Sequence, residues 1–224
     1  MCGRYTLTDP DPRRLRMRFS LDERAEVEAE PRYNIAPTDP VLAIRRDEEG
    51  DRDLGRLRWG LLPESFDAGG RPLINARAET IAVAKPFRES FEQRRCLLPA
   101  DGFYEWRKDE NGKQPVWISL PGAELFAFAG IWAMRRGEDG EPLHSCALAT
   151  CEPNETMRPI HGRMPVILPA GAEAAWLEPG ASVAELASLL VPYRGELEVR
   201  EVSDAVNDVR KDGPELLEPP LRLL

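Results

Sequence analysis

The sequence predicts an α+β fold, in which a mainly antiparallel, curled sheet forms an open barrel-like core with helices at its periphery. Strand-like segments crowd the middle of the chain, from Cys96 to Thr150, and short helical patterns lie on either side of them. Strands and helices grouped in this way are typical of the α+β class. A chain of 224 residues can bury a substantial core and still form one unit. We therefore expect residues 1–224 to form a single compact domain with one active site.

Turn and capping signals divide the first part of the chain into short elements. The run Asp9-Pro10-Asp11-Pro12 is typical of the entry to a helix, and Phe87 and Phe91 have the i, i+4 spacing of an amphipathic helix. The expected elements are a strand at 2–8, a helix that carries Leu15 and Phe19, paired strands at 41–46 and 54–59 across the polar 47–51 loop, an irregular stretch at 60–72 and a short helix within 80–94.

Strand signals dominate the chain from residue 96 to residue 150. Within this region Asn111-Gly112 is typical of the turn of a β-hairpin. Helical patterns and one more strand follow. The expected strands are 96–98, 102–106, 115–120, 125–134, 143–150 and 197–202, and the expected helices are 170–176 and 183–190.

The net charge of −9 argues against nonspecific binding to nucleic acids, because such binding depends on cations that meet phosphates. A nucleic-acid function therefore requires basic side chains to gather on one face. Almost all of these are arginines, whose forks suit bidentate phosphate contacts, although genome composition explains arginine usage equally well for most of them. No apolar run approaches the ~20 residues of a membrane span, and no signal-peptide pattern opens the chain. We expect a monomer in the cytoplasm, associated with the nucleoid when bound to DNA.

The cysteines are too few and too scattered to resemble a disulfide framework, so each is interpreted singly. His144 lies close in sequence to two of them and raises the possibility of zinc, but no C-x-x-C pair supports it and only one other histidine exists. Cys146 is better explained as a small hydrophobic residue on a strand. We expect no metal and no cofactor. The four cysteines are Cys2, Cys96, Cys146 and Cys151.

Cys2 becomes an unusual chemical group if Met1 is removed, because a free α-amine then lies beside a thiol. The reference pKa values of ~7.7–8.0 for the amine and ~8.5 for the thiol leave both groups usable near neutrality. The amine condenses with an aldehyde to an imine, and the thiolate of the same residue closes a five-membered thiazolidine. For Cys2 alone, the simpler interpretation of a small strand residue is favoured.

Six motifs occur in order along the chain, and a seventh, at 202–207, lies near its end. Together they resemble the SRAP family, the SOS response-associated peptidases, which include the abasic-site-shielding proteins of bacteria and animals. The likeness extends over essentially the whole chain. The six motifs are Cys2-Gly3-Arg4-Tyr5, Arg32-Tyr33-Asn34-Ile35-Ala36-Pro37, Trp59-Gly60-Leu61-Leu62-Pro63, Leu73-Ile74-Asn75-Ala76-Arg77-Ala78-Glu79-Thr80, Asp101-Gly102-Phe103-Tyr104-Glu105-Trp106 and Ile160-His161-Gly162-Arg163-Met164-Pro165.

The resemblance implies that Cys2 forms a thiazolidine crosslink with an abasic site in single-stranded DNA or at a single-strand to double-strand junction. Asn75, Glu105 and His161 match the active-site residues of the family. An amide can orient the amine and the sugar, a carboxyl can exchange protons with the amine, and an imidazole suits acid–base help. Simpler roles are a helix cap for Asn75, a solvent-facing position for Glu105 and an ordinary polar contact for His161.

Other residues near these motifs are candidates for DNA contacts. Three arginines adjoin the catalytic motifs and suit phosphate binding. Phe66 lies in the loop after Trp59-Gly60 and suits stacking on an unpaired base, although familiar bacterial members have a tryptophan-rich loop there. The candidate DNA-binding residues are Arg4, Arg77, Arg163, Phe66, Asn34 and Thr150. The resemblance also implies lyase cleavage of the DNA as a side reaction, self-processing of the N-terminus and reversal of the crosslink.

Two other classes of protein remain as alternatives. The start Met1-Cys2-Gly3 is also that of N-terminal-nucleophile glutamine amidotransferases, in which the thiol attacks an amide. A noncovalent DNA-binding module with a structural Cys2 is the other alternative, and it predicts salt-sensitive binding that survives Cys2→Ala.

Overall fold

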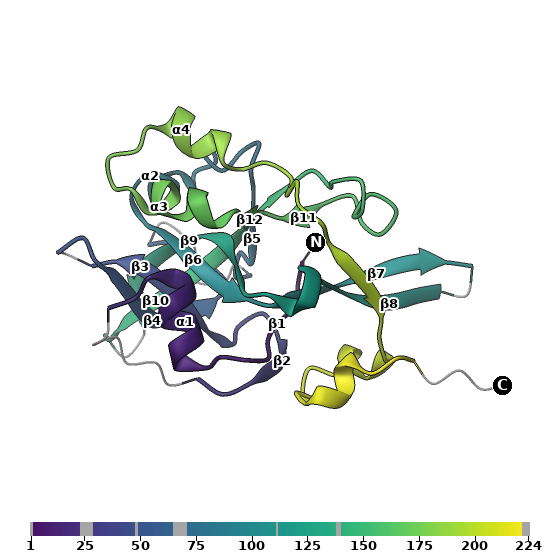
Figure 1. Cartoon of the computed structure of the whole chain (residues 1–224). Coiled ribbons are helices and arrows are strands. Elements are labelled where there is room, and N and C mark those ends of the chain that lie inside the picture. The colour runs from purple at the N-terminus through teal and green to yellow at the C-terminus, as the bar shows by residue number, and fades with distance from the viewer. Residues whose placement is uncertain are drawn as a thin grey trace.

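Two β-sheets organise the chain in the computed structural model, which describes residues 2–22, 29–47, 49–64, 71–110, 112–137 and 140–220 (Figure 1). The strands are β1 (Tyr5–Leu7), β2 (Arg32–Ile35), β3 (Pro40–Arg46), β4 (Arg52–Trp59), β5 (Asn75–Arg77), β6 (Arg95–Ala100), β7 (Gly102–Asp109), β8 (Gly112–Ser119), β9 (Phe126–Arg136), β10 (Pro142–Cys151), β11 (Met164–Pro165), β12 (Ile167–Leu168) and β13 (Glu198–Glu201). The helices are α1 (Pro12–Phe19), α2 (Arg88–Gln93), α3 (Glu173–Leu177) and α4 (Val183–Ser188), with short 3-10 turns η1 (Pro121–Ala123), η2 (Ala170–Ala172), η3 (Asp204–Asn207) and η4 (Pro214–Leu217).

The larger sheet closes on itself into a barrel-like core. Strands β10, β4, β3, β6 and β9 pair in that order, and β9 pairs back with β10. All of these pairs are antiparallel except β4 with β10, which run parallel. Gly130 on β9 faces Cys96 on β6, where an added Cβ would lie 2.7 Å from the cysteine sulfur. The predicted α+β fold with a curled, mainly antiparallel sheet is confirmed.

The smaller sheet is antiparallel throughout and has the order β13-β8-β7-β1-β2. Strands β7 and β8 form a long hairpin that extends from the body of the molecule (Figure 1). Tyr5 on β1 links this sheet to the barrel, because its ring packs edge-on against Trp59 and Phe128 with centroid distances of 5.3 and 5.7 Å. Burial of such large aromatic surfaces stabilises the junction of the sheets.

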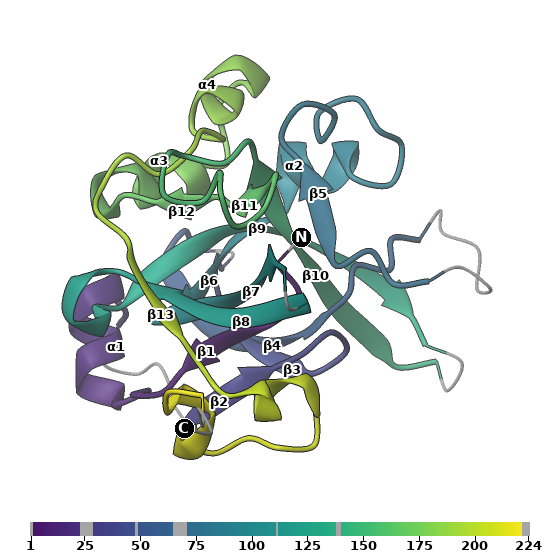
Figure 2. The same cartoon turned by 90° about the vertical axis from the view of Figure 1, so that its right-hand side faces the viewer.

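Local signals explain the helix that follows β1. Asp11 caps α1 by accepting hydrogen bonds from the backbone N–H groups of Arg13 and Arg14, and Pro12 occupies the first turn. The helix buries Leu15 and Phe19, as its sequence pattern predicts. Helices α3 and α4 lie together (Figure 2). Helix α2 packs on α3 through Phe91 and Trp176, whose ring centroids are 6.0 Å apart.

The sequence pattern misses four short strands and misplaces several boundaries. Strands β2, β5, β11 and β12 were not expected, because two to four residues are too few to show a period of two. The first strand spans only 5–7 of the expected 2–8, and the helix expected at 170–176 begins as a 3-10 turn. The hairpin expected near Asn111-Gly112 is confirmed by the pairing of Asp109 with Gly112. Among the described helices, none is long and apolar enough to cross a membrane.

A buried carboxylate holds three elements together and gives a test of the fold. Glu173 on α3 is almost fully buried and lies 2.8 Å from Arg18 on α1 and 3.6 Å from Arg52 on β4. Glu173→Ala leaves two half-buried guanidinium groups without their shared counter-ion, so we expect the free energy of unfolding to fall by about 3 kcal/mol. Urea denaturation measures this loss.

The matched control is Glu89→Ala, which breaks an exposed ion pair with Arg94 on α2. Surface ion pairs contribute little, so we expect a loss below about 1 kcal/mol. Equal, small losses for both variants would contradict the proposed importance of Glu173.

Candidate active site

The N-terminal segment runs into the space between the two sheets. Strand β1 pairs with β2 on one side and with β7 on the other, and the backbone N–H of Tyr104 donates to the carbonyl oxygen of Arg4 at 3.0 Å. Figures 1 and 2 show the segment before β1 lying between β7 and the edge of the barrel that β5, β10 and β11 form. Cys2 is fully buried there, and its thiol donates a weak hydrogen bond to the Arg4 carbonyl oxygen at 3.7 Å.

Asn75 holds the main chain of Cys2. Its Nδ2 donates to the carbonyl oxygen of Cys2 at 3.0 Å. The residue lies on β5, which runs parallel to β10 with Asn75 opposite Leu148, so it does not cap a helix. Its buried Oδ1 accepts no hydrogen bond within the described part of the chain. The amide therefore fixes one end of Cys2 and keeps an acceptor oxygen beside it.

Glu105 supplies a buried carboxyl near the Cys2 thiol. The residue lies on β7 between Tyr104 and Trp106 and is only 2% exposed, which excludes a solvent-facing role. Burial raises the pKa of Glu105, and the nearby His161 partly offsets that rise. Burial also raises the pKa of the Cys2 thiol, and the charge of Glu105 raises it further. A carboxyl with a raised pKa is a stronger base than an exposed carboxylate, which suits it to exchange protons with a neighbouring group.

His161 follows a turn in which its own backbone N–H donates to the carbonyl oxygen of Met157 at 2.9 Å. Its Nδ1 lies 3.0 Å from the backbone nitrogen of Arg163 and accepts that N–H. An amide N–H is always a donor, so this contact favours the neutral ring form that carries its proton on Nε2, although Nδ1 also lies 3.2 Å from the carbonyl oxygen of Arg163. The ring also acts electrostatically on Glu105. The structure thus brings Cys2, Asn75, Glu105 and His161 together from four separate segments.

The three arginines that the sequence singles out differ in their surroundings. Arg4 is half-buried, donates to the carbonyl oxygen of Gly3 at 3.0 Å, and has a pKa that burial lowers. Arg77 is exposed at the end of β5 and makes no ion pair within the described ranges. Arg163 binds Glu79 through both carboxylate oxygens, at 2.6 and 3.0 Å, and donates to the carbonyl oxygen of Thr150 at 2.6 Å. Of these three arginines, Arg77 is therefore the most accessible to a DNA phosphate.

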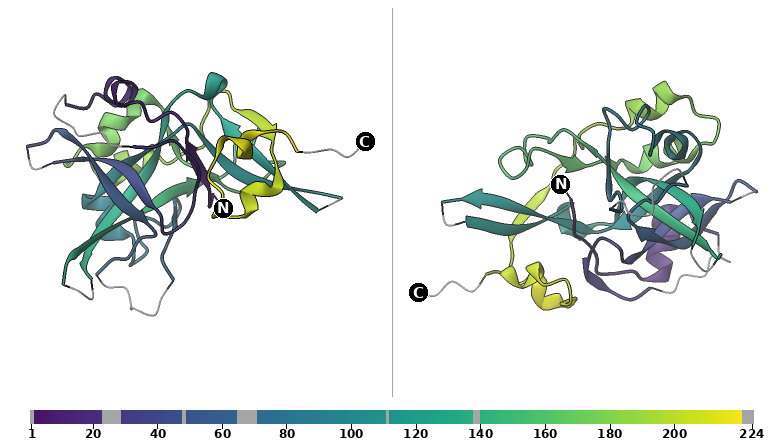
Figure 3. Two further views of the ribbon diagram at one scale, coloured as in Figure 1. Left: turned by 90° about the horizontal axis from the view of Figure 1, so that it is seen from below. Right: turned by 180° about the vertical axis from the view of Figure 1, so that it is seen from behind.

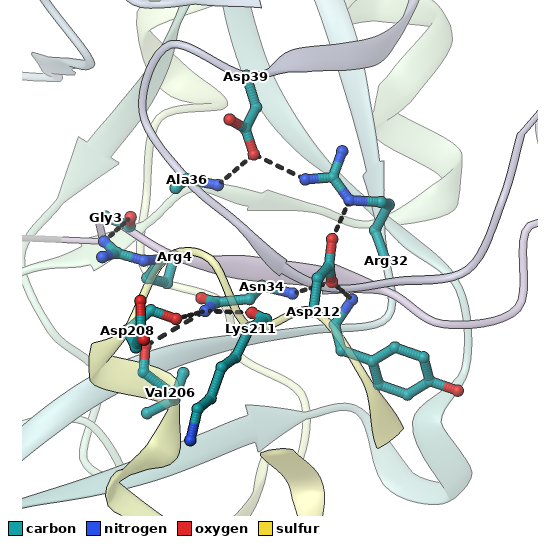
Figure 4. A network of polar contacts seen from close by, with 11 residues as sticks. Gly3, Arg4, Arg32, Asn34, Ala36, Asp39, Val206, Asp208, Lys211 and Asp212 are labelled. Atoms are coloured by element: carbon teal, nitrogen blue, oxygen red, sulfur yellow. Dashed lines mark hydrogen bonds and ion pairs between the residues drawn. The ribbon is translucent and has the colours of Figure 1, made fainter. Parts of the chain in front are cut away.

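Asn34 lies on β2, which pairs with β1, and Figure 4 shows it beside Arg4, where it anchors the C-terminal segment. Its Nδ2 donates to three carbonyl oxygens, those of Val206, Asp208 and Lys211, at 2.9 to 3.3 Å. The view from below shows this segment beside the N-terminal strand (Figure 3, left). Asp212 completes the anchor by accepting the backbone N–H of Asn34 at 2.8 Å. The amide donor of Asn34 is thus occupied by the protein, and its predicted contact with DNA stays a prediction.

Two candidates from the sequence remain, Thr150 and Phe66. Thr150 is fully buried on β10, where its hydroxyl lies 3.5 Å from the carbonyl oxygen of Ala76. Phe66 lies outside the described residues. Sequence reasoning missed Glu79 and Asp212, although Glu79 stands inside a quoted motif, two residues after Arg77. The position of this carboxylate close to Arg77 in the motif is the signal that could have identified it.

Within the described ranges, no group of three or more His, Cys, Asp and Glu side chains could hold a metal ion. His144 packs edge-on against Trp132 with ring centroids 5.7 Å apart, and Cys146 is fully buried on the same strand, β10. All four cysteines are free and buried. Burial raises the pKa of Cys96 and of Cys151 to about 12, which keeps these thiols protonated and unreactive.

The fold and the four-residue cluster at Cys2 define the class of protein. The chain belongs to the SRAP family, since the family model described as SOS response associated peptidase matches residues 1–209. It is similar to the abasic site processing protein YoqW of Bacillus subtilis, with 42% identity over 97% of this chain and 99% of that one. It is also similar to the abasic site processing protein YedK of Escherichia coli, with 32% identity over 98% and 100% of the two chains.

Relatives extend to animals and to solved structures. The abasic site processing protein HMCES of Xenopus tropicalis is 31% identical over 84% of this chain and 66% of its own length. A crystal structure of a Bacteroides thetaiotaomicron protein superposes with a TM-score of 0.86 at 23% identity, covering 98% of this chain and 100% of that one, and shows the shared fold. A Bordetella bronchiseptica protein superposes with a TM-score of 0.77 at 28% identity, covering 90% and 100%.

The buried carboxyl of Glu105 predicts a stability difference that depends on pH. Because its folded pKa is raised, its stabilising contribution is present below the unfolded pKa of ~4.3 and is lost as pH rises through the folded pKa. Glu105→Gln cannot ionise. We expect the variant to unfold at higher urea concentration than the parent at about pH 8, with the difference vanishing near about pH 4. A variant that is less stable than the parent at the higher pH would contradict this direction.

Proposed function

We propose that this protein captures abasic sites in single-stranded DNA through a covalent bond to Cys2. The proposal extends to this chain the printed description of its relatives as abasic site processing proteins. Its single strongest support is the grip of Asn75 on the Cys2 carbonyl beside the buried carboxyl of Glu105. A nucleophile held in this way is pre-oriented, which lowers the entropic cost of reaction.

The proposed reaction needs the α-amine of Cys2, so removal of Met1 precedes it and the mature domain begins at Cys2. The amine adds to the aldehyde carbon of the ring-opened sugar, and loss of one water molecule gives an imine. The thiol then adds across the carbon–nitrogen double bond, with sulfur bonding to carbon and the proton passing to nitrogen. The product is a thiazolidine, and water is the only molecule released.

The neighbours of Cys2 suit the proton transfers of this sequence. Glu105, whose pKa burial raises, takes the proton of the ammonium and returns a proton to the departing hydroxyl. In the neutral ring of His161, Nε2 carries a proton that can be donated to the sugar oxygen as the ring opens. Reversal of the crosslink uses the same groups in the opposite order.

The net charge of −9 repels the DNA phosphates, so arginines close to the site must attract them. Arg77 is the exposed cation at the end of β5, while Arg4 and Arg163 are largely engaged within the protein. Single-stranded DNA suits the proposal, because the aldehyde of an abasic sugar must leave the stack to meet a buried residue. We further propose cleavage by β-elimination as a side reaction of the imine, action as a monomer in the cytoplasm and nucleoid, and a role in the response to DNA damage.

Mixing the processed protein with an abasic single-stranded oligonucleotide tests the proposal on a denaturing gel. We expect the parent to give a heat-stable shifted band and Cys2→Ala and Cys2→Ser to give none. Glu105→Gln should form the band about a hundredfold more slowly, the lower end of the range for general acid–base catalysis. Intact mass measurement reports whether Met1 is absent from the active protein.

The control is Glu89→Gln, which changes an exposed carboxylate on α2 and should match the parent. A shifted band from protein that retains Met1 would refute the proposed nucleophile. Salt-sensitive binding that Cys2→Ala leaves intact, with no heat-stable band, would instead favour a noncovalent DNA-binding module. Release of glutamate from glutamine in a parallel assay, without crosslinking, would favour an N-terminal-nucleophile amidotransferase.

A further inference from the structure

Glu79 and Arg163 form a bidentate ion pair beside the turn that carries His161. Both carboxylate oxygens bind the guanidinium, Oε1 with Nη1 at 2.6 Å and Oε2 with Nη2 at 3.0 Å. Nη2 also donates to the carbonyl oxygen of Thr150 at 2.6 Å. The Arg163 side chain is mostly buried, whereas about half of Glu79 is exposed. A bidentate pair of this kind restricts a guanidinium far more than a single contact does.

The ion pair fixes the turn that carries His161. Glu79 follows β5, and Thr150 lies on β10, so both groups that grip Arg163 belong to one rigid edge of the barrel. Arg163 precedes β11, which pairs with β10 through Thr150 opposite Pro165. The side chain and the adjacent strand therefore anchor residue 163 from two directions. The backbone of this anchored residue is the partner of His161.

The backbone of Arg163 selects the form of the imidazole ring. Nδ1 of His161 lies 3.0 Å from the amide nitrogen of Arg163 and 3.2 Å from its carbonyl oxygen. A proton on Nδ1 of the neutral ring could be donated to this carbonyl oxygen, but it would lie against the amide N–H, a second donor at a shorter distance from Nδ1. The ring therefore accepts the N–H, and Nε2 becomes the nitrogen that carries the proton.

We infer that Glu79 is a positioning residue for His161: it holds Arg163, whose backbone N–H keeps the neutral imidazole protonated on Nε2. The inference deepens the proposed function, on which it rests for its catalytic meaning, because a ring with a fixed tautomer offers its proton in one direction. The hydrogen bond and charge of Arg163 lower the pKa of Glu79, so the carboxylate is ionised at neutral pH and the pair persists there. Arg163 acts in this arrangement as a structural fork between Glu79 and Thr150, and its predicted contact with DNA stays a prediction.

Long-range proton–nitrogen NMR on the full-length protein tests the inference directly. The chain has only two histidines, so a His161→Gln spectrum assigns the ring without ambiguity. In the parent we expect His161 to show an acceptor-type Nδ1 and a protonated Nε2. In Glu79→Ala and in Arg163→Lys, which cannot form the fork, we expect the tautomer ratio to move about fivefold toward that of a free imidazole, the factor that corresponds to one net hydrogen bond.

Two further variants test whether the change in tautomer ratio is specific to the Glu79–Arg163 pair and whether it occurs in folded protein. Glu89→Gln breaks an exposed ion pair elsewhere and should leave the His161 pattern unchanged. Glu79→Gln keeps one acceptor and a similar shape, so it remains folded if Glu79→Ala does not, and it should show an intermediate tautomer ratio. A His161 pattern in folded Glu79→Gln and Arg163→Lys that is identical to the parent's would overturn the inference.

The crosslinking gel supplies the second measurement. We expect Glu79→Gln to slow formation of the covalent band by less than tenfold, and Glu89→Gln to leave it unchanged. If the parent forms no covalent band at all, the proposed function fails, yet the NMR comparison still decides whether Glu79 positions His161. A shift in tautomer without any change in the crosslinking rate would overturn the catalytic meaning of the inference.

Discussion

The antiparallel pairing of β1 with β7 is the constraint on which the rest of the site depends. It places Tyr5 opposite Phe103 and ties the Arg4 carbonyl oxygen to Tyr104, so the residues just before β1 must lie alongside the strand that carries Glu105. On the other side, packing of Tyr5 against the barrel brings the same segment beside β5 and Asn75. A shift of one residue in this register would turn every side chain of β1 to the opposite face. Register, more than any single contact, therefore decides what lies next to Cys2.

The buried ionisable groups of the site lower the stability of the folded protein. Burial raises the pKa of both the Glu105 carboxyl and the Cys2 thiol, and the charge of Glu105 raises the pKa of the thiol further, so both groups would be easier to accommodate as uncharged, unreactive groups. The barrel offsets this cost through the burial of large apolar side chains in its core, such as Trp59, Phe126 and Phe128. Stable scaffolds commonly carry destabilised functional sites in this way.

Much of the fold was readable from the sequence because its signals are local. The cap at Asp11, the apolar face of α1 and the apolar run of β3 that ends at the polar 47–51 loop each depend on neighbouring residues. The closure of the barrel by the parallel pairing of β10 with β4, and the pairing of β10 with β5, could not be predicted, since they join segments that are far apart in the sequence and share no local pattern. The same limit applies to the site. Residue chemistry and family motifs named its four central residues, but only the fold reveals that Asn75 grips the Cys2 carbonyl and that Glu79 occupies Arg163.

The wide spacing of the site residues also bears on how the protein is made. The segment with Cys2 leaves the ribosome early, whereas β7, the turn that carries His161, and β11 are made much later. Pairing between distant segments is slow, because closing a long loop costs conformational entropy before any contact can offset that cost. During synthesis the early segment consequently remains open to solvent and to other enzymes. The removal of Met1 that we propose thus has a natural interval, which ends when the late strands dock and enclose the thiol.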